Sequence, residues 1–327
     1  MLKYARVTGW GKYLPDKVVT NQELEKKVNT SDTWIQTRTG IKERRLAADD
    51  EVASDMAIKA AKDALAVAGV KPEQLDLVIV ATVTPEMIFP SCASLVQHAI
   101  GAKNAAAFDL NAACNGFVSA VSTASQYIGT GTYKKILVVG SEVYSRILDW
   151  TDRGTCVLFG DGAGAVVLET GDGPAGFLSF NMGSDGSKPD ILYLLGICGA
   201  PANKVDDNHY ISMNGSEVYK VAVRSMTKSC KKALADAGLT INDVNLLVPH
   251  QANKRIIQAV GKKLGLNEDK VFLNVQKYGN TSAASIPIAL CEAVEQGLIK
   301  DNDNIVFVAF GAGLSWGASV LKWGTGR

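Results

Sequence analysis

The sequence predicts an α/β protein built from two related halves. Short runs rich in β-branched residues alternate with segments of helical periodicity, which is typical of this fold class. The segments 64–69 (ALAVAG) and 233–238 (ALADAG) each precede a strand, and their offset is 169 residues. The strands predicted at 136–140 and 305–310 have the same offset. We therefore expect a duplication, with one half at 1–172 and the other at 173–327.

Each strand of the predicted core is a short continuous apolar run. Strands that are covered on both faces lack polar alternation, and such runs occur at 75–82, 136–140, 245–249 and 305–310. Further strands are expected at 107–110 and 165–168.

The helices follow from apolar spacing and from their end signals. Residues 54–68 begin with Ser54, a favourable N-cap, and stop before Gly69, which suits the left-handed end of a helix. Residues 217–237 have an apolar face and predict a longer helix. The alanine- and serine-rich segment 117–128 predicts a buried helix.

Composition and charge exclude several classes of protein. The 327 residues include 34 Lys and Arg and 33 Asp and Glu, so no overall basic field favours nucleic acid or membrane. We find no apolar window long enough for a membrane helix and no signal-peptide pattern. Six scattered cysteines without a C-x-x-C pair, and three histidines, argue against a zinc site or a disulfide framework. These features predict a soluble, cytoplasmic protein.

Three residues are candidates for chemistry. Cys114 lies at a predicted strand-to-helix turn, where free N–H groups and the helix dipole favour a thiolate with a lowered pKa. His250 directly follows a predicted strand, and Asn280 lies in a turn (YGNTS) of the same half. Taken alone, each residue is also typical of a structural role: a core cysteine, a capping histidine and a turn asparagine. The duplication brings Cys114 from one half opposite Asn280 and His250 from the other.

Two further patterns border these candidates. The glycine-rich segments 160–164 and 311–317 lack the G-x-G-x-x-G and P-loop spacings, so a dinucleotide site is not expected. The turn at 310–313 is instead suited to point backbone N–H groups at a reaction centre. Arg255 and Lys262 share one face of a predicted helix, with Lys263 beside them. This basic face is either an ordinary solvated face or a docking site for an acidic partner.

Taken together, these motifs resemble the β-ketoacyl-acyl carrier protein synthase III family of the thiolase superfamily along nearly the whole chain. The matching segments are 30–41 (TSDTWIQTRTGI), 112–117 (AACNGF), 152–155 (DRGT), 159–165 (FGDGAGA), 248–253 (VPHQAN), 279–284 (GNTSAA) and 310–317 (FGAGLSWG). The resemblance implies a thiolase-like duplicated five-layer α/β/α/β/α sandwich. It also implies a decarboxylative Claisen condensation of a short acyl-CoA with malonyl-acyl carrier protein, which gives 3-oxoacyl-acyl carrier protein, coenzyme A and CO₂ and initiates fatty-acid synthesis.

The resemblance also assigns roles to individual residues. Cys114 is expected to carry the acyl group, with His250 and Asn280 stabilising the enolate and the backbone N–H groups of Cys114 and Ala312 forming the oxyanion hole. The coenzyme A residues are expected to be Trp34, Arg38, Arg153, Gly154, Met213, Ala252, Asn253 and Phe310. The carrier protein is expected to meet Lys220, Gln251, Arg255, Lys262 and Lys263. Phe159 and Phe89 are expected at the acyl pocket, with Phe89 reaching into the partner subunit of a homodimer.

Some segments depart from the family pattern, and two other functions stay open. Residues 144–150 and 187–207 match weakly and are expected to line the acyl pocket. We expect neither a metal nor a cofactor, since the coenzyme A thioester is the substrate. A starter condensing enzyme or acyltransferase of polyketide or other secondary metabolism would use the same three residues. A non-catalytic partner subunit of the same fold should have lost them.

Overall fold

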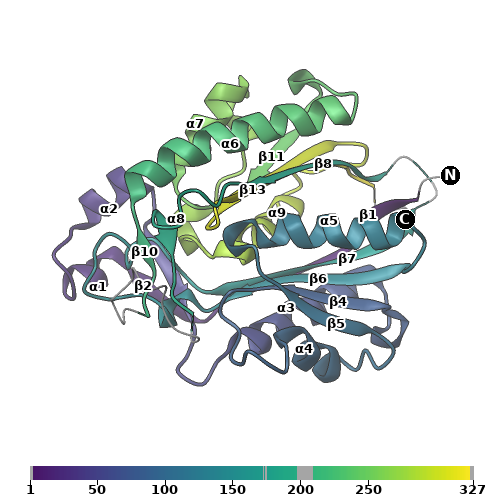
Figure 1. Ribbon diagram of the computed structural model, residues 1–327, viewed down its shortest axis with the longest axis horizontal. Coiled ribbons are helices and arrows are strands. Elements are labelled where there is room, and N and C mark those ends of the chain that lie inside the picture. Colours follow the sequence, from purple (N-terminus) through teal and green to yellow (C-terminus); the bar gives the residue numbers. More distant parts are fainter. Residues whose placement is uncertain (1–2, 172, 174, 197–208, 325–327) are drawn as a thin grey trace.

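Two β-sheets, each covered by helices on both faces, organise the chain (Figure 1). The structure is a computed structural model that describes residues 3–171, 173, 175–196 and 209–324. The first sheet has the strand order β1-β7-β6-β4-β5, with bounds Tyr4–Tyr13, Gly162–Gly171, Lys135–Glu142, Leu77–Ala81 and Ala106–Leu110. The second has the order β11-β12-β13-β8, with bounds Leu246–Pro249, Asn304–Gly311, Ser315–Lys322 and Gly176–Ser184.

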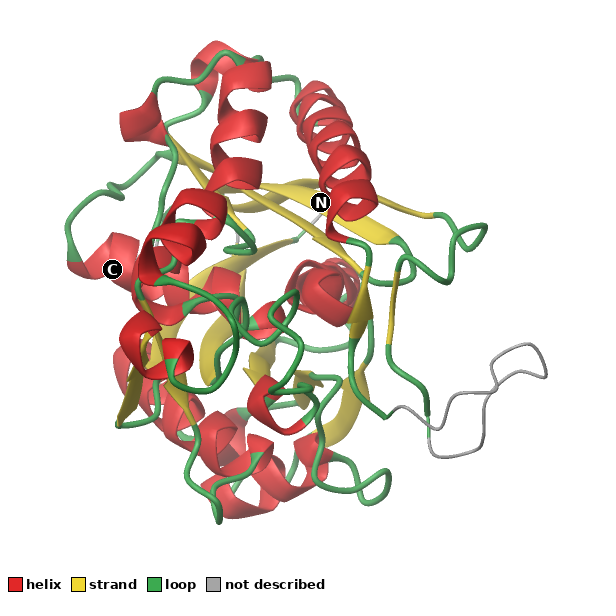
Figure 2. Ribbon diagram, turned by 90° about the vertical axis from the view of Figure 1, so that its left-hand side faces the viewer, coloured by secondary structure: helices red, strands yellow, loops and turns green. Residues whose placement is uncertain are grey.

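Pairs of helices form three further layers. α5 (Gly116–Gly129) and α9 (Ser285–Glu295) lie between the sheets. α3 (Ala53–Ala68) and α4 (Cys92–Ile100) cover the outer face of the first sheet, and α6 (Gly215–Asp236) and α7 (Lys254–Leu264) cover that of the second. Figure 2 shows these helices outside and between the strands. The order is α/β/α/β/α, so the predicted five-layer fold is confirmed.

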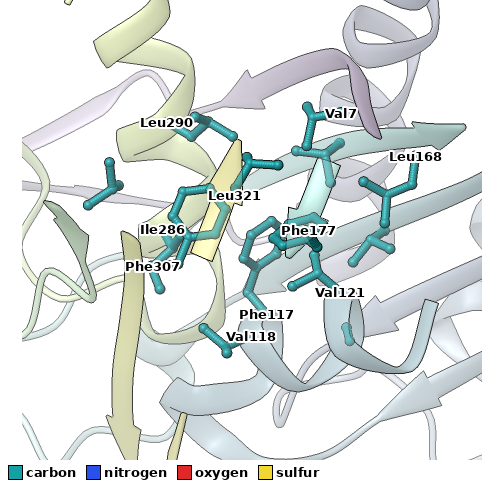
Figure 3. Close-up of a cluster of buried hydrophobic side chains, with 14 of the residues drawn as sticks. Val7, Phe117, Val118, Val121, Leu168, Phe177, Ile286, Leu290, Phe307 and Leu321 are labelled. Carbon is teal, nitrogen blue, oxygen red and sulfur yellow. The ribbon is translucent and has the colours of Figure 1, made fainter. Parts of the chain in front are cut away.

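The central layer is held by apolar side chains from both sheets (Figure 3). Phe117 of α5 lies edge-on to Phe307 of β12, with 6.3 Å between ring centroids, and Phe177 of β8 lies 6.0 Å from Phe307. All three rings are buried. Burying a side chain of this kind contributes roughly 1.5–3 kcal/mol. Both sheets therefore depend on the same pair of central helices.

The sequence repeat recurs in the elements. β6 and β12 begin at residues 135 and 304, and α5 and α9 begin at 116 and 285. The 3₁₀ turns η2 (Ala113–Asn115) and η6 (Ser282–Ala284) precede these helices, while η1 (Pro72–Gln74) and η4 (Ile241–Asp243) precede β4 and β11. The predicted boundary at 172/173 falls between β7 and β8, and residues 172 and 174 lie outside the described residues.

Smaller elements cover one end of the sheets. They are β2 (Lys17–Thr20), α1 (Asn21–Glu25), α2 (Asp32–Thr39), β3 (Glu43–Leu46), η3 (Tyr144–Arg146), β9 (Leu192–Tyr193), β10 (Ser212–Met213), η5 (Glu268–Lys270) and α8 (Val275–Tyr278). β2 pairs with β3, and β9 with β10. These elements contribute several walls of the cavity described below.

One end signal differs from the prediction. α3 begins at Ala53 with Val52 as its N-cap, and Ser54 is buried inside the first turn. The Asp55 carboxylate accepts the hydrogen bond of the Val52 N–H instead. Gly69 does end the helix in the left-handed conformation, with φ 66°. The prediction of Ser54 as the N-cap was therefore wrong: the helix begins one residue earlier, and the Asp55 carboxylate bonds the N–H of the cap residue Val52.

A buried arginine joins the covering elements to the sheets. The Arg44 guanidinium is 0% exposed and donates to Val19 O (3.1 Å), Asn21 Oδ1 (2.9 Å) and Val157 O (2.8 Å). Burial lowers its pKa to about 10. The chain at 157, which leads to Phe159, is thus tied to β3.

Replacing Arg44 by alanine should lower the free energy of unfolding by about 3–5 kcal/mol, because a cavity forms and buried acceptors lose their donor. The Arg45→Ala variant is the control: its side chain is half-buried and donates to one carbonyl, at Pro15. Its loss should stay near 1 kcal/mol. Urea unfolding measures both, and equal losses would contradict the role given to Arg44.

Candidate active site

Cys114 lies in the tight turn η2, between β5 and α5. Ala113, the residue before it, adopts φ 46°, which L-residues seldom do. The turn lies against β12: a Cβ placed on Gly311 would be 2.8 Å from the Cys114 nitrogen. Glycine at 311 therefore lets a strand of the second sheet approach the turn that carries the cysteine.

The environment of the thiol differs from the prediction. The Cys114 side chain is buried, and burial raises its pKa to about 11, although hydrogen bonds from Ser282 and Tyr144 act in the opposite direction. The expectation of a lowered pKa at the helix N-terminus was wrong, because the loss of hydration on burial is the largest influence on the pKa of this thiol. A group that accepts the thiol proton is therefore needed during any reaction.

His250 extends β11 and lies at the start of the segment leading to α7. The backbone N–H of His250 donates to Val308 O at 2.8 Å, and the ring Nδ1 lies 2.6 Å from Ser285 Oγ. Ser285 Oγ also accepts the Gln251 N–H, and we assign its own proton to the hydrogen bond with Nδ1. This assignment places the ring proton on Nε2. Burial lowers the pKa of His250 to about 3, which keeps the ring neutral.

Asn280 lies at a β-bridge to Phe159, just before η6. Its Oδ1 accepts the N–H of Ser282 at 2.8 Å, so the NH₂ group is left to donate elsewhere. Ser282 has φ 49°, the counterpart of Ala113 in the other half. A Cβ on Gly140 of β6 would lie 2.3 Å from Ala283 O, so η6 approaches the first sheet as closely as η2 approaches the second.

These side chains meet in one cavity of about 1270 Å³. Cys114, His250 and Asn280 all line it, so residues from both halves converge as the sequence predicted. Most of the other predicted residues line it too: Trp34, Arg38, Gly154, Phe159, Met213, Lys220, Ala252, Asn253, Arg255, Phe310 and Ala312.

The turn between β12 and β13 brings Ala312 to the same place. Ser315 Oγ lies within hydrogen-bond distance of Ala312 O (3.1 Å) and Ala112 O (3.3 Å). This hydroxyl therefore links the Ala312 turn to the segment that leads into Cys114. The arrangement fixes the two backbone segments whose N–H groups the sequence assigned to an oxyanion hole.

The cavity lining includes an aromatic ring with two cations close to it. Trp34 of α2 has the guanidinium of Arg153 5.2 Å and that of Arg38 5.5 Å from its ring centroid. Arg153 also donates to Asn29 O. Arg153 does not line the cavity itself, yet all three predicted residues form one cluster. Flat aromatic groups and phosphates suit such a cluster.

The predicted basic face is present, with one correction. Lys220, Arg255, Lys262 and Lys263 are exposed, and Arg255 lies over the Tyr219 ring at 5.6 Å. Gln251 is 1% exposed, and its amide bonds Pro249 O, Phe272 O and the N–H groups of residues 274 and 275. Gln251 was therefore wrong as a docking residue, since its side chain is occupied inside the protein.

Two stacked aromatic rings line the cavity. Phe159 is buried and stacks on Tyr144, with 4.8 Å between centroids and 22° between planes. Phe89 is 83% exposed and lies outside this cavity, which its neighbour Ile88 lines. The segment 187–207, expected at the pocket, contributes Pro189 and 192–196, while 197–208 lie outside the described residues.

Two residues near the thiol, Ser282 and Glu142, were not among the predicted site residues, whereas Tyr144 belongs to the segment 144–150 expected at the acyl pocket, which contributes Tyr144 and Ile147 to the cavity. Tyr144 begins η3, Ser282 lies within the GNTS motif, and Glu142 ends β6. A carboxylate at the carboxyl end of an otherwise apolar strand was the available signal for Glu142. Within 3–171, 173, 175–196 and 209–324, no cluster of His, Cys, Asp and Glu could hold a metal. No helix in those ranges is long and apolar enough to cross a membrane.

Comparison with known proteins agrees with this geometry. A model of the family 3-oxoacyl-[acyl-carrier-protein] synthase III matches residues 108–186, and the model of the C-terminal part of that family matches 234–323. A β-ketoacyl-[acyl-carrier-protein] synthase III of Clostridium acetobutylicum is 53% identical over 326 residues, covering 97% of this chain and 98% of that protein.

Solved structures of similar proteins have the same fold. The 3-oxoacyl-[acyl-carrier-protein] synthase III of Aquifex aeolicus is 50% identical with a TM-score of 0.93, covering 98% of this chain and 100% of that one. The enzyme of Thermus thermophilus is 47% identical with a TM-score of 0.94, covering 98% and 99%. This chain belongs to the 3-oxoacyl-[acyl-carrier-protein] synthase III family of acyl-transferring condensing enzymes, which initiate fatty-acid synthesis.

Proposed function

We propose that this chain condenses a short acyl-CoA with malonyl-acyl carrier protein, and that Cys114 carries the acyl group between the two substrates. The observation that carries the proposal is the convergence of Cys114, His250 and Asn280 on one cavity. The Cys114 sulfur attacks the thioester carbonyl, and coenzyme A leaves. The N–H groups of Cys114 and Ala312 stabilise the oxyanion formed on the way.

In the second half-reaction, His250 and Asn280 hold the thioester carbonyl of the malonyl group. Loss of CO₂ leaves an enolate, whose carbon attacks the acyl-Cys114 carbonyl. The neutral His250, with its proton on Nε2, and the Asn280 NH₂ group both donate hydrogen bonds, which favours the enolate oxygen. Donors that are already oriented cost no rearrangement when the negative charge develops.

The cluster of Trp34, Arg38 and Arg153 is proposed to hold the adenine and phosphates of coenzyme A. The pantetheine arm then passes Gly154, Met213, Ala252, Asn253 and Phe310 toward Cys114. Neither a metal nor a cofactor is part of this proposal, since the coenzyme A thioester is itself the substrate. We further propose a cytoplasmic homodimer in which the exposed Phe89 reaches the partner's acyl pocket, with the chain divided into halves near residue 172.

The exposed cations Lys220, Arg255, Lys262 and Lys263 are proposed to dock the acidic carrier protein. Arg255→Glu should raise the apparent KM for malonyl-acyl carrier protein by about tenfold, because a reversed charge repels the partner. The rate of acylation by acyl-CoA should stay within about twofold of wild type.

A matched charge reversal on the opposite side of the molecule controls for net charge. Lys62→Glu on α3 changes the net charge of the protein by the same amount as Arg255→Glu. It should leave both half-reactions unchanged. Steady-state kinetics with malonyl-acyl carrier protein and single-turnover acylation separate the two effects. An unchanged KM in Arg255→Glu would remove Arg255 from the docking surface.

Acyl loading tests the whole proposal. The protein is mixed with acyl-CoAs from acetyl through branched five-carbon to long chains, and intact mass with peptide mapping locates the adduct. One adduct on Cys114 supports the proposal, and the best-loaded chain identifies the primer. Absence of any adduct would point to an acyl-carrier protein as donor and favour a condensing enzyme of secondary metabolism.

A further inference from the structure

A buried carboxylate beside the active site has no role in the mechanism above. Glu142 is 0% exposed at the end of β6. Its Oε2 accepts hydrogen bonds from Thr82 Oγ1 (3.3 Å), the Val83 N–H (3.1 Å) and Thr84 Oγ1 (2.7 Å). Its Oε1 faces Ser282 Oγ at 3.1 Å. The three donors on Oε2 hold the carboxylate in one orientation, in which Oε1 points toward Ser282.

Ser282 connects this carboxylate to the nucleophile. The turns η2 and η6 pack against each other; the hydroxyls of Ser282 and Tyr144 lie 3.1 Å apart, and both act on the Cys114 thiol as partners that lower its pKa. The left-handed φ of Ser282 and the bond from its N–H to Asn280 Oδ1 hold it in this position. Uncommon backbone conformations of this kind are concentrated at functional sites.

We propose that Ser282 and Glu142 form a proton relay for Cys114, in which Ser282 passes the thiol proton to the Glu142 carboxylate during acyl transfer. This inference rests on the proposed role of Cys114. As the Cys114 S–C bond forms, the S–H proton moves to Ser282 Oγ while the Ser282 proton moves to Glu142 Oε1. The coenzyme A S–C bond breaks, and the proton on Glu142 Oε1 moves through Ser282 Oγ to the leaving coenzyme A thiolate, since the Cys114 sulfur is now acylated; this step regenerates the carboxylate.

The surroundings of Glu142 suit a proton acceptor. Burial raises its pKa to about 7, so both forms of the carboxyl group are accessible near neutral pH. The titratable groups that face it are Cys114, Tyr144 and Cys92. Asp55, Glu86 and Asp109 act on Cys92 through their charges, as Glu142 does. His250, held neutral by burial, is a much weaker base.

Glu142→Gln tests the relay with little change in shape. The glutamine oxygen can still accept from residues 82–84, while its NH₂ group faces Ser282 and cannot take up a proton. We expect single-turnover acylation at pH 7 to slow by about 100-fold. The pH–rate profile should also move to higher pH, because the thiol must then lose its proton to solvent.

The opposite result distinguishes the relay from a simple charge effect. A carboxylate near a thiol raises the pKa of that thiol, so Glu142 acting only as a charge would make Glu142→Gln acylate faster. If the wild type loads Cys114 and Glu142→Gln acylates at an unchanged or faster rate, the relay alone is overturned. A wild type that does not load Cys114 would overturn the proposed function and the relay together.

Ser282→Ala provides a second variant, should Glu142→Gln fold poorly. Its counterpart in the other half is Ala113, which adopts the same φ, so alanine fits the backbone. It should lose acylation to a similar extent, and wild-type behaviour would overturn the relay. Ser125→Ala is the matched control: it removes a buried serine hydroxyl that donates to Val121 O, outside the cavity, keeps the Cys114–Ser282–Glu142 path, and should change the rate by less than about threefold.

Discussion

Cys114→Ala is expected to abolish acyl loading. The variant has no nucleophile in the turn η2, so no acyl-enzyme should form with any acyl-CoA, and turnover should fall by at least about 10⁴-fold. Intact mass after incubation with acyl-CoA, followed by peptide mapping, measures the loss directly. The loss should not come from unfolding, since removing one buried sulfur costs only about 1–2 kcal/mol.

Cys230→Ala provides the matched control for this experiment. Cys230 is also fully buried, in α6, and burial raises the pKa of its thiol to about 12. It does not line the cavity, so its replacement should leave loading and turnover intact. An adduct that persists in Cys114→Ala would assign the nucleophile to another residue.

Asn280→Ala is expected to separate the two half-reactions. Acylation of Cys114 should continue, since its oxyanion donors are backbone groups, whereas condensation should fall by about 10²–10³-fold through loss of one enolate donor. Loading is followed by intact mass, and condensation by release of CO₂ from malonyl-acyl carrier protein. The same assay applied to Asn104→Ala, an exposed asparagine that bonds only a loop carbonyl at Glu73, should show wild-type rates.

The Asn280 side chain also holds the backbone of η6. Asn280 Oδ1 also accepts the Ser282 N–H, so the alanine variant loses an anchor of η6. Asn280→Asp keeps an acceptor for that N–H but cannot donate to the enolate. It should therefore acylate normally and still fail to condense. Equal loss of both half-reactions in Asn280→Asp would contradict the proposed division of roles.

Much of the fold was predictable because its signals are local. Apolar runs placed β4, β6, β11 and β12 to within about two residues, and Gly69 placed the end of α3. The repeat offset predicted two related α/β halves, and the motifs placed Cys114, His250 and Asn280 around one cavity. These features depend on short stretches of sequence and on the connectivity of the halves.

The remainder depends on three-dimensional packing. The exposure of Gln251 could not be predicted because its neighbours 272–275 come from a later segment and enclose its amide. The pKa of Cys114 depends on dehydration by both halves of the protein. The path from Cys114 to Glu142 joins η2, η6 and β6, which lie far apart in the sequence and meet only after folding.

Gly140 and Gly311 have a consequence for the chain as a whole. Each lies in a strand that a turn of the other half approaches, η6 at Gly140 and η2 at Gly311. The approach is so close that a methyl group at either position would collide with that turn. Each of the turns η2 and η6 therefore packs against a strand of the opposite half. If the polypeptide were cut between β7 and β8, the two fragments should be inert separately and should regain acyl transfer when mixed. Such complementation would make this fold a reporter of fragment association.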